Sequence, residues 1–370
     1  MPRAVHVTSV HNPFDNRIFM KECASLRDSG WEVVLVAQHE QDETVDGIRI
    51  RALPQVQSRM QRMRELPPLA RRIALEEQPD ILHFHDPELL PVAAALAAGG
   101  RRVIYDMHEN IVKDVLTKRW INPLLRPLVS GYMRMRMRGW LRRLRVIFAE
   151  DSYAADYPYV KDFITVLNMP RLDSLQGLEV QERERPGLAY IGGLTELRGS
   201  ERMLRLLAGL QAAGLDVGLE LIGPVDAGHA QRLAELVREL GLRRVRFHGF
   251  MRADEAWPIV ASCHIGLALL SRIPNYEHSY PSKIFEYMAL GLPVVTSDFE
   301  LYRGIVEANG AGICVDPDDD AAVLAAVQGL LEDPQRWQAM SEAARNAAME
   351  KYSWEREAGK LLALYEEMLG

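Results

Sequence analysis

Short runs of β-branched and apolar residues alternate along this chain with longer stretches in which apolar residues recur every three or four positions. The short runs predict buried strands, and the longer stretches predict amphipathic helices such as residues 18–29, ended by Gly30, and residues 230–240, ended by Gly241. Strands that alternate with helices are typical of parallel sheets built from βαβ units. The expected strands are residues 4–10, 32–37, 81–84, 102–105, 146–149 and 164–167, followed by 188–191, 218–222, 245–248, 265–269, 294–296 and 312–315.

The two series of strands predict an α/β protein with two doubly wound, Rossmann-like domains. The division falls where Pro170 and Pro186 flank a charged run at residues 181–185, a composition typical of a polar linker. The chain has 370 residues, which is enough for two domains of ordinary size. We expect a first domain at residues 1–169, a linker at 170–186 and a second domain at 187–351.

Composition and charge narrow the class of protein. Hydrophobic residues make up 48% and charged residues 26%, as in soluble globular proteins, and the net charge of −7 argues against nucleic acid as a general partner. Cys23, Cys263 and Cys314 are far apart and odd in number, so we expect neither a disulfide framework nor a zinc cluster. This cysteine usage, a strand-like start without a signal peptide and the lack of an apolar run of about 20 residues predict a cytoplasmic protein.

The most informative stretch is residues 280–296, which predicts a turn, a short helix, a glycine stop and a buried strand. Ser282 is expected to cap the helix, and Gly291 suits the left-handed residue that ends it. The start of such a helix attracts anions, above all phosphate, and Lys283 adds a full charge. Glu286 lies nearly one turn further on, where a carboxylate suits the two vicinal hydroxyls of a ribose. A purely structural helix and strand is the alternative.

The order Pro-Ser-Lys…Phe-Glu-Tyr-Met-Ala-Leu-Gly-Leu-Pro-Val in this stretch resembles the nucleotide-sugar site of retaining family-4 glycosyltransferases, and the resemblance covers nearly the whole chain. It implies the GT-B fold, in which two Rossmann-like domains face a cleft and the second domain binds the nucleotide sugar. The last helix, here residues 352–369, would pack back on the first domain. The resemblance also implies nucleotide contacts from Ser282, Lys283, Ile284 and Glu286. The nucleotide sugar is a substrate, so we expect no cofactor.

A second stretch, residues 190–199, follows an expected strand and precedes a helix. Backbone can approach a phosphate closely at Gly192 and Gly193, because neither residue has a Cβ atom. The stretch resembles the family's diphosphate loop, with Arg198 at the lysine position and Gly193 where the family usually has arginine. We expect Arg198 and Lys283 to bind the diphosphate, with Lys283 replacing the missing cation. The alternative for Arg198 is a solvated charge at a helix start.

The family's pair of glutamates eight positions apart is only half present in this chain. Glu286 matches the second glutamate, His278 stands at the first, and Glu277 is one residue early. Because the missing glutamate normally approaches the donor sugar, the identity of that sugar stays open. Residues 247–250 resemble the loop that holds the nucleobase through backbone groups. His248 in this loop is counted among the nucleotide contacts, although a structural role is favoured for its side chain.

The loop after the first expected strand, residues 9–19, lacks the Gly-x-Gly-x-x-Gly turn of dinucleotide enzymes, which argues against a nicotinamide dehydrogenase. It resembles a His-x-Pro-Phe-Asp-x-Arg stretch found in a subset of the family. Asp15 and Arg17 are therefore candidates for contacts on the acceptor side or the phosphate side. Asp15 could equally cap the next helix.

Two further strands end in polar clusters, at residues 83–88 and 105–109. Doubly wound sheets place their ligands at the carboxyl ends of strands. The resemblance implies that His108 faces the donor sugar, and His85, Asp86 and Glu109 could hold acceptor hydroxyls. The same groups could also be interpreted as a metal site. We expect no metal, because no Asp-x-Asp pattern accompanies them and catalysis in the family needs no ion.

Residues 117–145 contain no Asp or Glu, but eight arginines and Lys118 are interleaved with leucine, methionine and tryptophan. On an acidic protein this local reversal predicts a basic, partly apolar surface that docks on anionic lipid. Each cation near such a surface contributes roughly 1 kcal/mol, so a handful suffices for reversible attachment. A solvated helix with a buried apolar stripe is the alternative. Nucleic acid is disfavoured, since no binding module is recognisable.

Together these features predict a retaining glycosyltransferase that moves a hexose-type sugar from UDP or GDP to a hydroxyl of a glycan or lipid-linked acceptor, in surface polysaccharide or glycolipid synthesis. His108, Arg198 and Lys283 are the expected catalytic residues, and the leaving phosphate oxygen could take the acceptor proton. We expect a cytoplasmic location with peripheral attachment to the inner face of a membrane. The alternatives are a GT-B epimerase, a phosphorylase-like enzyme and an inactive nucleotide-sugar-binding subunit. The oligomeric state stays open.

Overall fold

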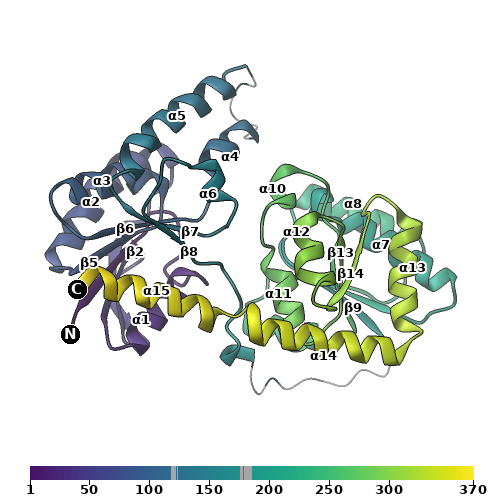
Figure 1. Cartoon of the computed structure of the whole chain (residues 1–370). Helices are drawn as coiled ribbons and strands as arrows, with labels where there is room; N and C mark the ends of the chain where they lie inside the picture. The colour runs from purple at the N-terminus through teal and green to yellow at the C-terminus, as the bar shows by residue number, and fades with distance from the viewer. Residues whose placement is uncertain (118–121, 123, 176–177, 179–185) are drawn as a thin grey trace. The chain divides into compact units, whose positions relative to one another are not determined.

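The computed structural model of this chain describes residues 1–117, 122, 124–175, 178 and 186–370 (Figure 1). It divides into two compact units, each with its own sheet. Unit 1 comprises Met1–Asn168 and Trp354–Gly370, and unit 2 comprises Met169–Ser353. The charged run at 181–185 and residues 118–121 of the basic stretch lie outside the described residues. The expectation of two doubly wound, parallel sheets is confirmed.

Unit 1 is built on an eight-stranded sheet in the order β3-β4-β2-β1-β5-β6-β7-β8, in which only β3 and β4 pair antiparallel. The order reverses between β1 and β5, so the carboxyl ends of these two strands lie where doubly wound sheets bind ligands. The strands are β1 Arg3–Val7, β2 Glu32–Gln38, β3 Glu43–Val45, β4 Ile48–Leu53, β5 Ile81–Phe84, β6 Val103–Met107, β7 Arg145–Phe148 and β8 Phe163–Thr165.

The hairpin formed by β3 and β4 is absent from the expected strands. Asp46 and Gly47 join the two strands with positive φ angles of 49° and 76°, as a tight two-residue turn requires. In β4, Ile48 and Ile50 are buried, whereas Arg49 and Arg51, which alternate with them, are only partly buried. Half of the strand is therefore polar, and its signal in the sequence is weaker than that of the apolar runs in the sheet centre.

Helices cover both faces of this sheet (Figure 1). The π-helix η1, α1 and α15 pack on one face, and α2, α3 and α5 pack on the other. The single helix expected at residues 18–29 is thus two helices, η1 and α1, which end just before Gly30. The helices are η1 Ile18–Cys23, α1 Ala24–Asp28, α2 Arg59–Glu76, η2 Pro87–Leu89, α3 Leu90–Ala98, α4 Ile111–Thr117, α5 Arg126–Leu141, α6 Tyr153–Asp156 and α15 Trp354–Leu369.

The last helix, α15, belongs to unit 1 although the chain reaches it from unit 2. Trp354, Leu361 and Tyr365 are buried in the same apolar cluster as residues of η1 and α1. The indole N–H of Trp354 donates to the Ser25 hydroxyl at 2.9 Å. This helix therefore completes the core on one face of the unit 1 sheet.

Unit 2 contains a six-stranded parallel sheet in the order β11-β10-β9-β12-β13-β14, which reverses between β9 and β12. The strands are β9 Gly187–Ile191, β10 Gly218–Ile222, β11 Val245–Gly249, β12 Ile265–Ala268, β13 Val294–Ser297 and β14 Gly312–Val315. The helices are η3 Asp173–Leu175, η4 Glu196–Arg198, α7 Ser200–Ala212, α8 Ala227–Glu239, α9 Ala253–Ala261, α10 Pro274–Glu277, α11 Ser282–Ala289, α12 Glu300–Tyr302, η5 Arg303–Glu307, α13 Asp320–Leu331 and α14 Pro334–Lys351.

Candidate active site

The first candidate site lies in unit 2, at the glycine turn that follows β9. Gly192 has a φ of 133°, a conformation that favours glycine, and a Cβ atom built on it would lie 3.3 Å from both Cε and Nζ of Lys283. A Cβ atom on Gly193 would lie 3.4 Å from a terminal nitrogen of Arg198. The turn therefore brings together the two cations that the sequence predicts for the diphosphate.

Lys283 comes from the first turn of α11, and its residue surface is only 8% exposed. Its Nζ lies 5.0 Å from the centre of the Tyr190 ring, which suits a cation–π contact. Burial lowers the pKa of Lys283 and the charge of Arg198 lowers it further, to about 8, although Glu286 opposes this shift. A buried cation next to another cation is unfavourable by itself, so a bound anion would stabilise this arrangement.

Arg198 ends the short helix η4, and its guanidinium hydrogen-bonds to the hydroxyls of Tyr276 and Tyr190. Burial alone would lower the pKa of Arg198, but these tyrosines outweigh burial and raise it, so the side chain stays charged. Gly199 follows with a φ of 79°, and a Cβ atom there would lie 2.2 Å from the carbonyl oxygen of Leu269. This contact requires glycine and fixes the loop that carries Arg198.

The start of α11 differs from the expectation for Ser282 and for Ile284. The helix begins at Ser282, and extended Pro281 occupies the capping position, so the predicted cap by the Ser282 hydroxyl is wrong. Ile284 is fully buried and its N–H donates to the Pro281 carbonyl oxygen at 3.0 Å, so its side chain offers nothing to a nucleotide. Glu286 is partly buried one turn along the helix and stays the predicted ribose ligand.

His248, at the end of β11, has its ring engaged by another residue. The Nε2 atom lies 2.6 Å from a carboxylate oxygen of the buried Glu220 on the neighbouring strand β10. The hydrogen bond to Glu220 therefore gives the His248 side chain a structural role. A contact between the backbone of this loop and a nucleobase stays a prediction.

Unit 2 also contains a pocket of about 710 Å³ next to the short helix α10. Glu277 and His278 both line it, so the two residues considered for the family's first glutamate position face the same space. Its other lining residues are Arg272, Tyr280, Asp298, Phe299, Glu300, Leu301, Gly304, Ile305 and Tyr352. In the chain, Glu277 and His278 come directly after Tyr276, which hydrogen-bonds to Arg198.

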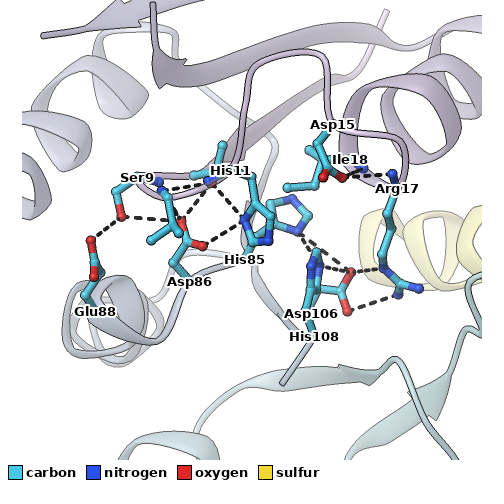
Figure 2. Close-up of polar contacts among 12 residues, drawn as sticks. Ser9, His11, Asp15, Arg17, Ile18, His85, Asp86, Glu88, Asp106 and His108 are labelled. Atoms are coloured by element: carbon cyan, nitrogen blue, oxygen red, sulfur yellow. Dashed lines mark hydrogen bonds and ion pairs between the residues drawn. The ribbon is translucent and has the colours of Figure 1, made fainter. Parts of the chain in front are cut away.

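The second candidate site lies in unit 1, at the carboxyl ends of β1, β5 and β6 (Figure 2). Arg17 is buried there, and its guanidinium donates to the two carboxylate oxygens of Asp106 at 3.0 and 3.1 Å. It also lies 2.9 Å from the buried Glu22 and donates to the Val166 carbonyl oxygen at 2.9 Å. The prediction that Arg17 contacts an acceptor or a phosphate is therefore wrong, because buried partners engage its guanidinium.

Two predicted acceptor-side carboxylates are likewise engaged by the protein. Asp15 accepts hydrogen bonds at 2.8 and 2.9 Å from the N–H groups at the start of η1, which is the helix-capping alternative. Asp86 is buried and accepts from the Thr8 hydroxyl at 2.8 Å and from the Val10 N–H at 3.1 Å. Burial would raise the pKa of Asp86, but its hydrogen bonds and His11 lower it to about 2. Neither carboxylate is available as a direct hydroxyl ligand.

His85 is buried in a row of hydrogen-bonded side chains. Its Nε2 lies 3.0 Å from Nδ1 of His6, whose Nε2 lies 3.1 Å from the Tyr365 hydroxyl, which in turn lies 2.8 Å from Nδ1 of His83. Burial is the main cause that lowers the pKa of these histidines, that of His85 to about 4. The prediction of an acceptor contact from His85 is wrong, because the ring is enclosed and its nitrogens face other rings.

Part of this row has the spacing of a metal site. His6, Glu22, His83 and His85 each place one ligand atom within 4.8 Å of the others. However, the contact between His6 and His85 uses two of the ring nitrogens that would have to face an ion. Among the described residues, we interpret the three histidines of this group, with Tyr365, as a hydrogen-bonded row of neutral rings.

Two histidines remain partly exposed at this edge of the sheet. Nε2 of His108 lies 3.0 Å from a carboxylate oxygen of Asp106, and its ring centre lies 4.9 Å from that of His11. Glu109, the next residue, is exposed. Burial would lower the pKa of His11, but the hydrogen bond and charge of Asp86, with Asp15 and Glu109, raise it. The sequence prediction missed His11, although the residue follows β1 in the same loop as Asp15.

The basic stretch folds in part into α5, which packs on unit 1 through Ser130, Met137 and Leu141. On the opposite face, Leu128, Tyr132 and Met135 are exposed and repeat at i, i+4 and i+7. The helix therefore has a buried stripe and a second, exposed apolar stripe. Four exposed arginines flank the exposed stripe: Arg134, Arg136, Arg138 and Arg142. None of the helices described here has the length and apolar character to cross a membrane.

Two family models match the chain, one in each unit. The model of glycosyl transferases group 1 matches residues 179–347, and the model of the glycosyl transferase 4-like domain matches residues 16–157. The chain therefore belongs to the family-4-like glycosyltransferases of the GT-B fold.

Individual proteins are similar over most of the chain. Phosphatidyl-myo-inositol mannosyltransferase of Mycolicibacterium smegmatis is 26% identical over 355 residues, which cover 93% of this chain and 88% of that protein. Sucrose-phosphate synthase of Thermosynechococcus elongatus has a similar fold, with a TM-score of 0.79 at 16% identity over 100% of this chain and 99% of the other. HepE of Anabaena, solved with UDP and glucose, gives a TM-score of 0.73 at 15% identity over 99% and 100%.

Proposed function

We propose that this protein transfers a hexose-type sugar from UDP or GDP to a hydroxyl group. The observation that carries the proposal is the pair formed by Lys283 and Arg198 at the glycine turn after β9. Two cations that contact one tyrosine, with a helix start beside them, suit a diphosphate better than a neutral ligand. A protein of similar fold, HepE, was solved with UDP and glucose, which supports a nucleotide sugar as the ligand.

In the proposed reaction the bond between the sugar and the diphosphate breaks, and negative charge develops on the leaving oxygen. Lys283, Arg198 and the start of α11 stabilise that charge, an electrostatic contribution that is usually the largest in such sites. Glu286 accepts hydrogen bonds from the ribose hydroxyls. The proton of the attacking hydroxyl passes to the leaving phosphate oxygen while the new glycosidic bond forms on the same face of the sugar, which gives retention.

For the donor sugar we propose the pocket that Glu277 and His278 line. The proposal is supported by the position of these two residues in the chain, directly after Tyr276, whose hydroxyl hydrogen-bonds to Arg198. Carboxylate and imidazole groups can hydrogen-bond to sugar hydroxyls, and the aromatic residues of the pocket can cover a sugar face.

For the acceptor we propose a lipid-linked glycan or glycolipid precursor at the inner face of a membrane. In α5, Arg136 lies on one flank of the exposed apolar stripe, and Arg134 and Arg138 lie on the other. This arrangement is typical of helices that lie in a membrane interface and bind anionic lipid. The helix also projects away from the sheet of unit 1 (Figure 1). The name of the mannosyltransferase relative, which includes a phosphatidyl group, supports the same class of acceptor.

Vesicle flotation tests the membrane proposal. The protein should float with vesicles that contain anionic lipid at low salt, stay behind with zwitterionic vesicles, and be released at high salt. A variant with Leu128→Ser and Met135→Ser should lose flotation. Met349→Ser is the matched control, because this exposed methionine lies on α14 of unit 2. The proposal would be contradicted if flotation did not depend on salt, or if Met349→Ser reduced flotation as much as the double variant does.

A thermal-shift screen with UDP, GDP, ADP and their sugars tests the nucleotide proposal, since a ligand that binds the folded state raises the apparent stability. At least one diphosphate should raise the midpoint, and the corresponding nucleoside should raise it much less. No response to any diphosphate would contradict the proposal.

An inactive nucleotide-sugar-binding subunit is the second candidate, because His278 and Gly193 depart from the family pattern. Such a subunit would respond in the same screen. It would release no nucleoside diphosphate from the sugar nucleotide that binds, whereas a transferase should do so slowly even with water as acceptor.

A further inference from the structure

The hydroxyl of Tyr159 in unit 1 is buried and has no hydrogen-bond partner among the described residues. Tyr159 lies between α6 and β8, and its ring packs edge-on against that of Tyr157, with the ring centres 6.0 Å apart. Two nearby tyrosines do have partners. The Tyr153 hydroxyl donates to the His108 carbonyl oxygen at 3.2 Å. The Tyr157 hydroxyl donates to the side-chain oxygen of Asn110 at 2.9 Å. Because most buried polar groups are hydrogen-bonded, the unpartnered Tyr159 hydroxyl indicates a missing acceptor.

Three arginines of α5 lie close enough to Tyr159 for their charges to act on its hydroxyl. This arginine trio consists of Arg134, Arg138 and Arg142. Its members are four residues apart, so they lie on one side of the helix, and all three are exposed. No carboxylate pairs with the trio in the part of the chain that the structure describes, whereas Arg145 contacts both an aspartate and a glutamate. Three like charges without a counter-charge repel one another and gain from a bound anion.

The position of the trio on α5 defines its depth in a membrane. At about 100° per residue, the trio separates the buried stripe, which packs on unit 1, from the exposed apolar stripe. When the exposed stripe enters the apolar part of a membrane, the trio and Tyr159 lie at the level of the lipid phosphates. Burial raises the pKa of Tyr159, although the charges of the trio lower it, so the hydroxyl keeps its proton and can donate to an anion.

We propose that the arginine trio and the Tyr159 hydroxyl form a binding site for a lipid phosphomonoester, whose phosphate carries close to two negative charges. Arginine suits such a group, because its planar guanidinium can donate two parallel hydrogen bonds to phosphate oxygens. The Tyr159 hydroxyl donates one more. A phosphodiester headgroup has a single charge and fewer free oxygens, so it satisfies fewer of these donors. Selection of the headgroup rests on the proposed membrane attachment of α5 and goes beyond it by naming the chemistry that the helix prefers.

Vesicle titrations of the full chain test the class of headgroup. One set of vesicles contains phosphatidic acid, a phosphomonoester, and the other contains enough phosphatidylglycerol, a phosphodiester, to match its surface charge. The protein should bind the first set about tenfold more tightly. Equal binding, or tighter binding to phosphatidylglycerol, overturns the site but leaves the proposed membrane attachment standing. Binding to neither set refutes both.

Tyr159→Phe separates the site from a general attraction of charges. The substitution removes a buried hydroxyl without a partner, so the free energy of unfolding should stay unchanged or rise. Binding to phosphatidic acid should weaken about tenfold, as expected for one hydrogen bond to a charged group, and binding to phosphatidylglycerol should not change. Tyr157→Phe is the matched control, because it breaks the hydrogen bond to Asn110 and should lower stability while the lipid preference stays. An unchanged preference in Tyr159→Phe overturns the site.

A second pair of variants compares the two flanks of the exposed stripe. Arg138→Gln should remove most of the preference for phosphatidic acid. Arg136→Gln is its control, because Arg136 lies on the other flank, with its guanidinium carbon 4.8 Å from the centre of the Trp140 ring. This control should weaken binding to both sets of vesicles equally. Equal loss of the preference in the two variants would assign it to net charge and overturn the site.

Glycerol 3-phosphate and inorganic phosphate are the soluble probes. Neither should displace the protein from phosphatidic acid more than sodium chloride does at the same ionic strength, because neither contacts the exposed apolar stripe. Stronger displacement would show that the trio binds a soluble phosphate, which overturns the assignment to a lipid. The response of Tyr159→Phe to nucleoside diphosphates is measured in parallel and should equal that of the wild type. Absence of that response in both proteins would refute the proposed sugar transfer while leaving the headgroup site standing.

Discussion

The two ligand edges of this protein treat charge in opposite ways. In unit 1, Arg17 contacts the buried Asp106 and Glu22, and its cation compensates the carboxylate of Asp106, while burial and the charge of Asp106 raise the pKa of Glu22 well above its ordinary value. In unit 2, Lys283 and Arg198 meet at a glycine turn. Lys283 contacts the ring of Tyr190, and Arg198 hydrogen-bonds to the hydroxyl of the same tyrosine. The first arrangement is complete without a ligand, whereas the second places like charges together and gains from an added anion.

The comparison teaches that charged residues at the carboxyl ends of strands do not all have the same role. An arginine with two buried carboxylates stabilises the fold and orients its neighbours. A buried lysine whose pKa is lowered to about 8 is a candidate for binding and catalysis. The following predictions apply matched changes to the two edges.

The largest expected effect comes from Arg17→Met. Removing the cation leaves the buried carboxylate of Asp106 without its counter-charge, which should lower the free energy of unfolding by about 3–5 kcal/mol. Denaturant unfolding measures this loss. A change within experimental error would show that Arg17 does not hold the unit 1 edge together.

The matched substitution Lys283→Met should affect ligand binding rather than the stability of the free protein. Because it removes a buried cation that has no bound anion in the free protein, the free energy of unfolding should stay unchanged or rise. Thermal stabilisation by the nucleoside diphosphate should be lost. Destabilisation of the free protein comparable to that of Arg17→Met would mean that Lys283 is a structural residue.

The affinity for a nucleoside diphosphate should fall as the pH rises through about 8, the pKa of Lys283 in the free protein. Below that pH the lysine is already charged, and above it binding must take up a proton, so the apparent affinity falls by up to about tenfold per pH unit. Calorimetry in two buffers of different ionisation enthalpy measures the proton uptake. Lys283→Arg should flatten the profile, and an unchanged profile in that variant would assign the effect to another group.

A smaller effect is expected at the glycine turn. Gly192→Ala places a methyl group 3.3 Å from Lys283 on a backbone with a φ of 133°, which should cost about 1–3 kcal/mol in stability or in diphosphate affinity. Gly193→Ala is the control, because its backbone has no such φ and its Cβ would lie 3.4 Å from the flexible end of Arg198. Equal effects of the two substitutions, in unfolding and in binding, would contradict the close approach at Gly192.

The sequence predicts most of the fold because apolar runs report buried strands directly. Residues 81–84, 218–222 and 312–315 have the predicted bounds, since apolar residues dominate each of these short strands of a parallel sheet. The hairpin of β3 and β4 escapes prediction, because its strands are short and half polar. The Ser282 cap fails because Pro281 already has the extended conformation that the capping position needs.

The sequence places the site residues better than it assigns their roles. Asp86 and His85 do lie at the ligand edge of unit 1, but their burial depends on contacts with distant residues such as Thr8 and His6. Such contacts depend on tertiary packing, which the spacing of residues along the sequence does not reveal. A detectable signal is the alternation of polar residues at the ends of β5 and β6, where His83 and His85, and Asp106 and His108, are two positions apart, the spacing of residues on one face of a strand.

Calorimetric titration with UDP, GDP and ADP beside their nucleosides tests most directly whether the cations of unit 2 bind a diphosphate. The wild-type protein should bind one diphosphate more tightly than its nucleoside, and Arg198→Met should remove most of that difference while leaving nucleoside binding unchanged. Equal affinity of diphosphate and nucleoside for the wild-type protein, or an unchanged difference in the variant, would contradict the account.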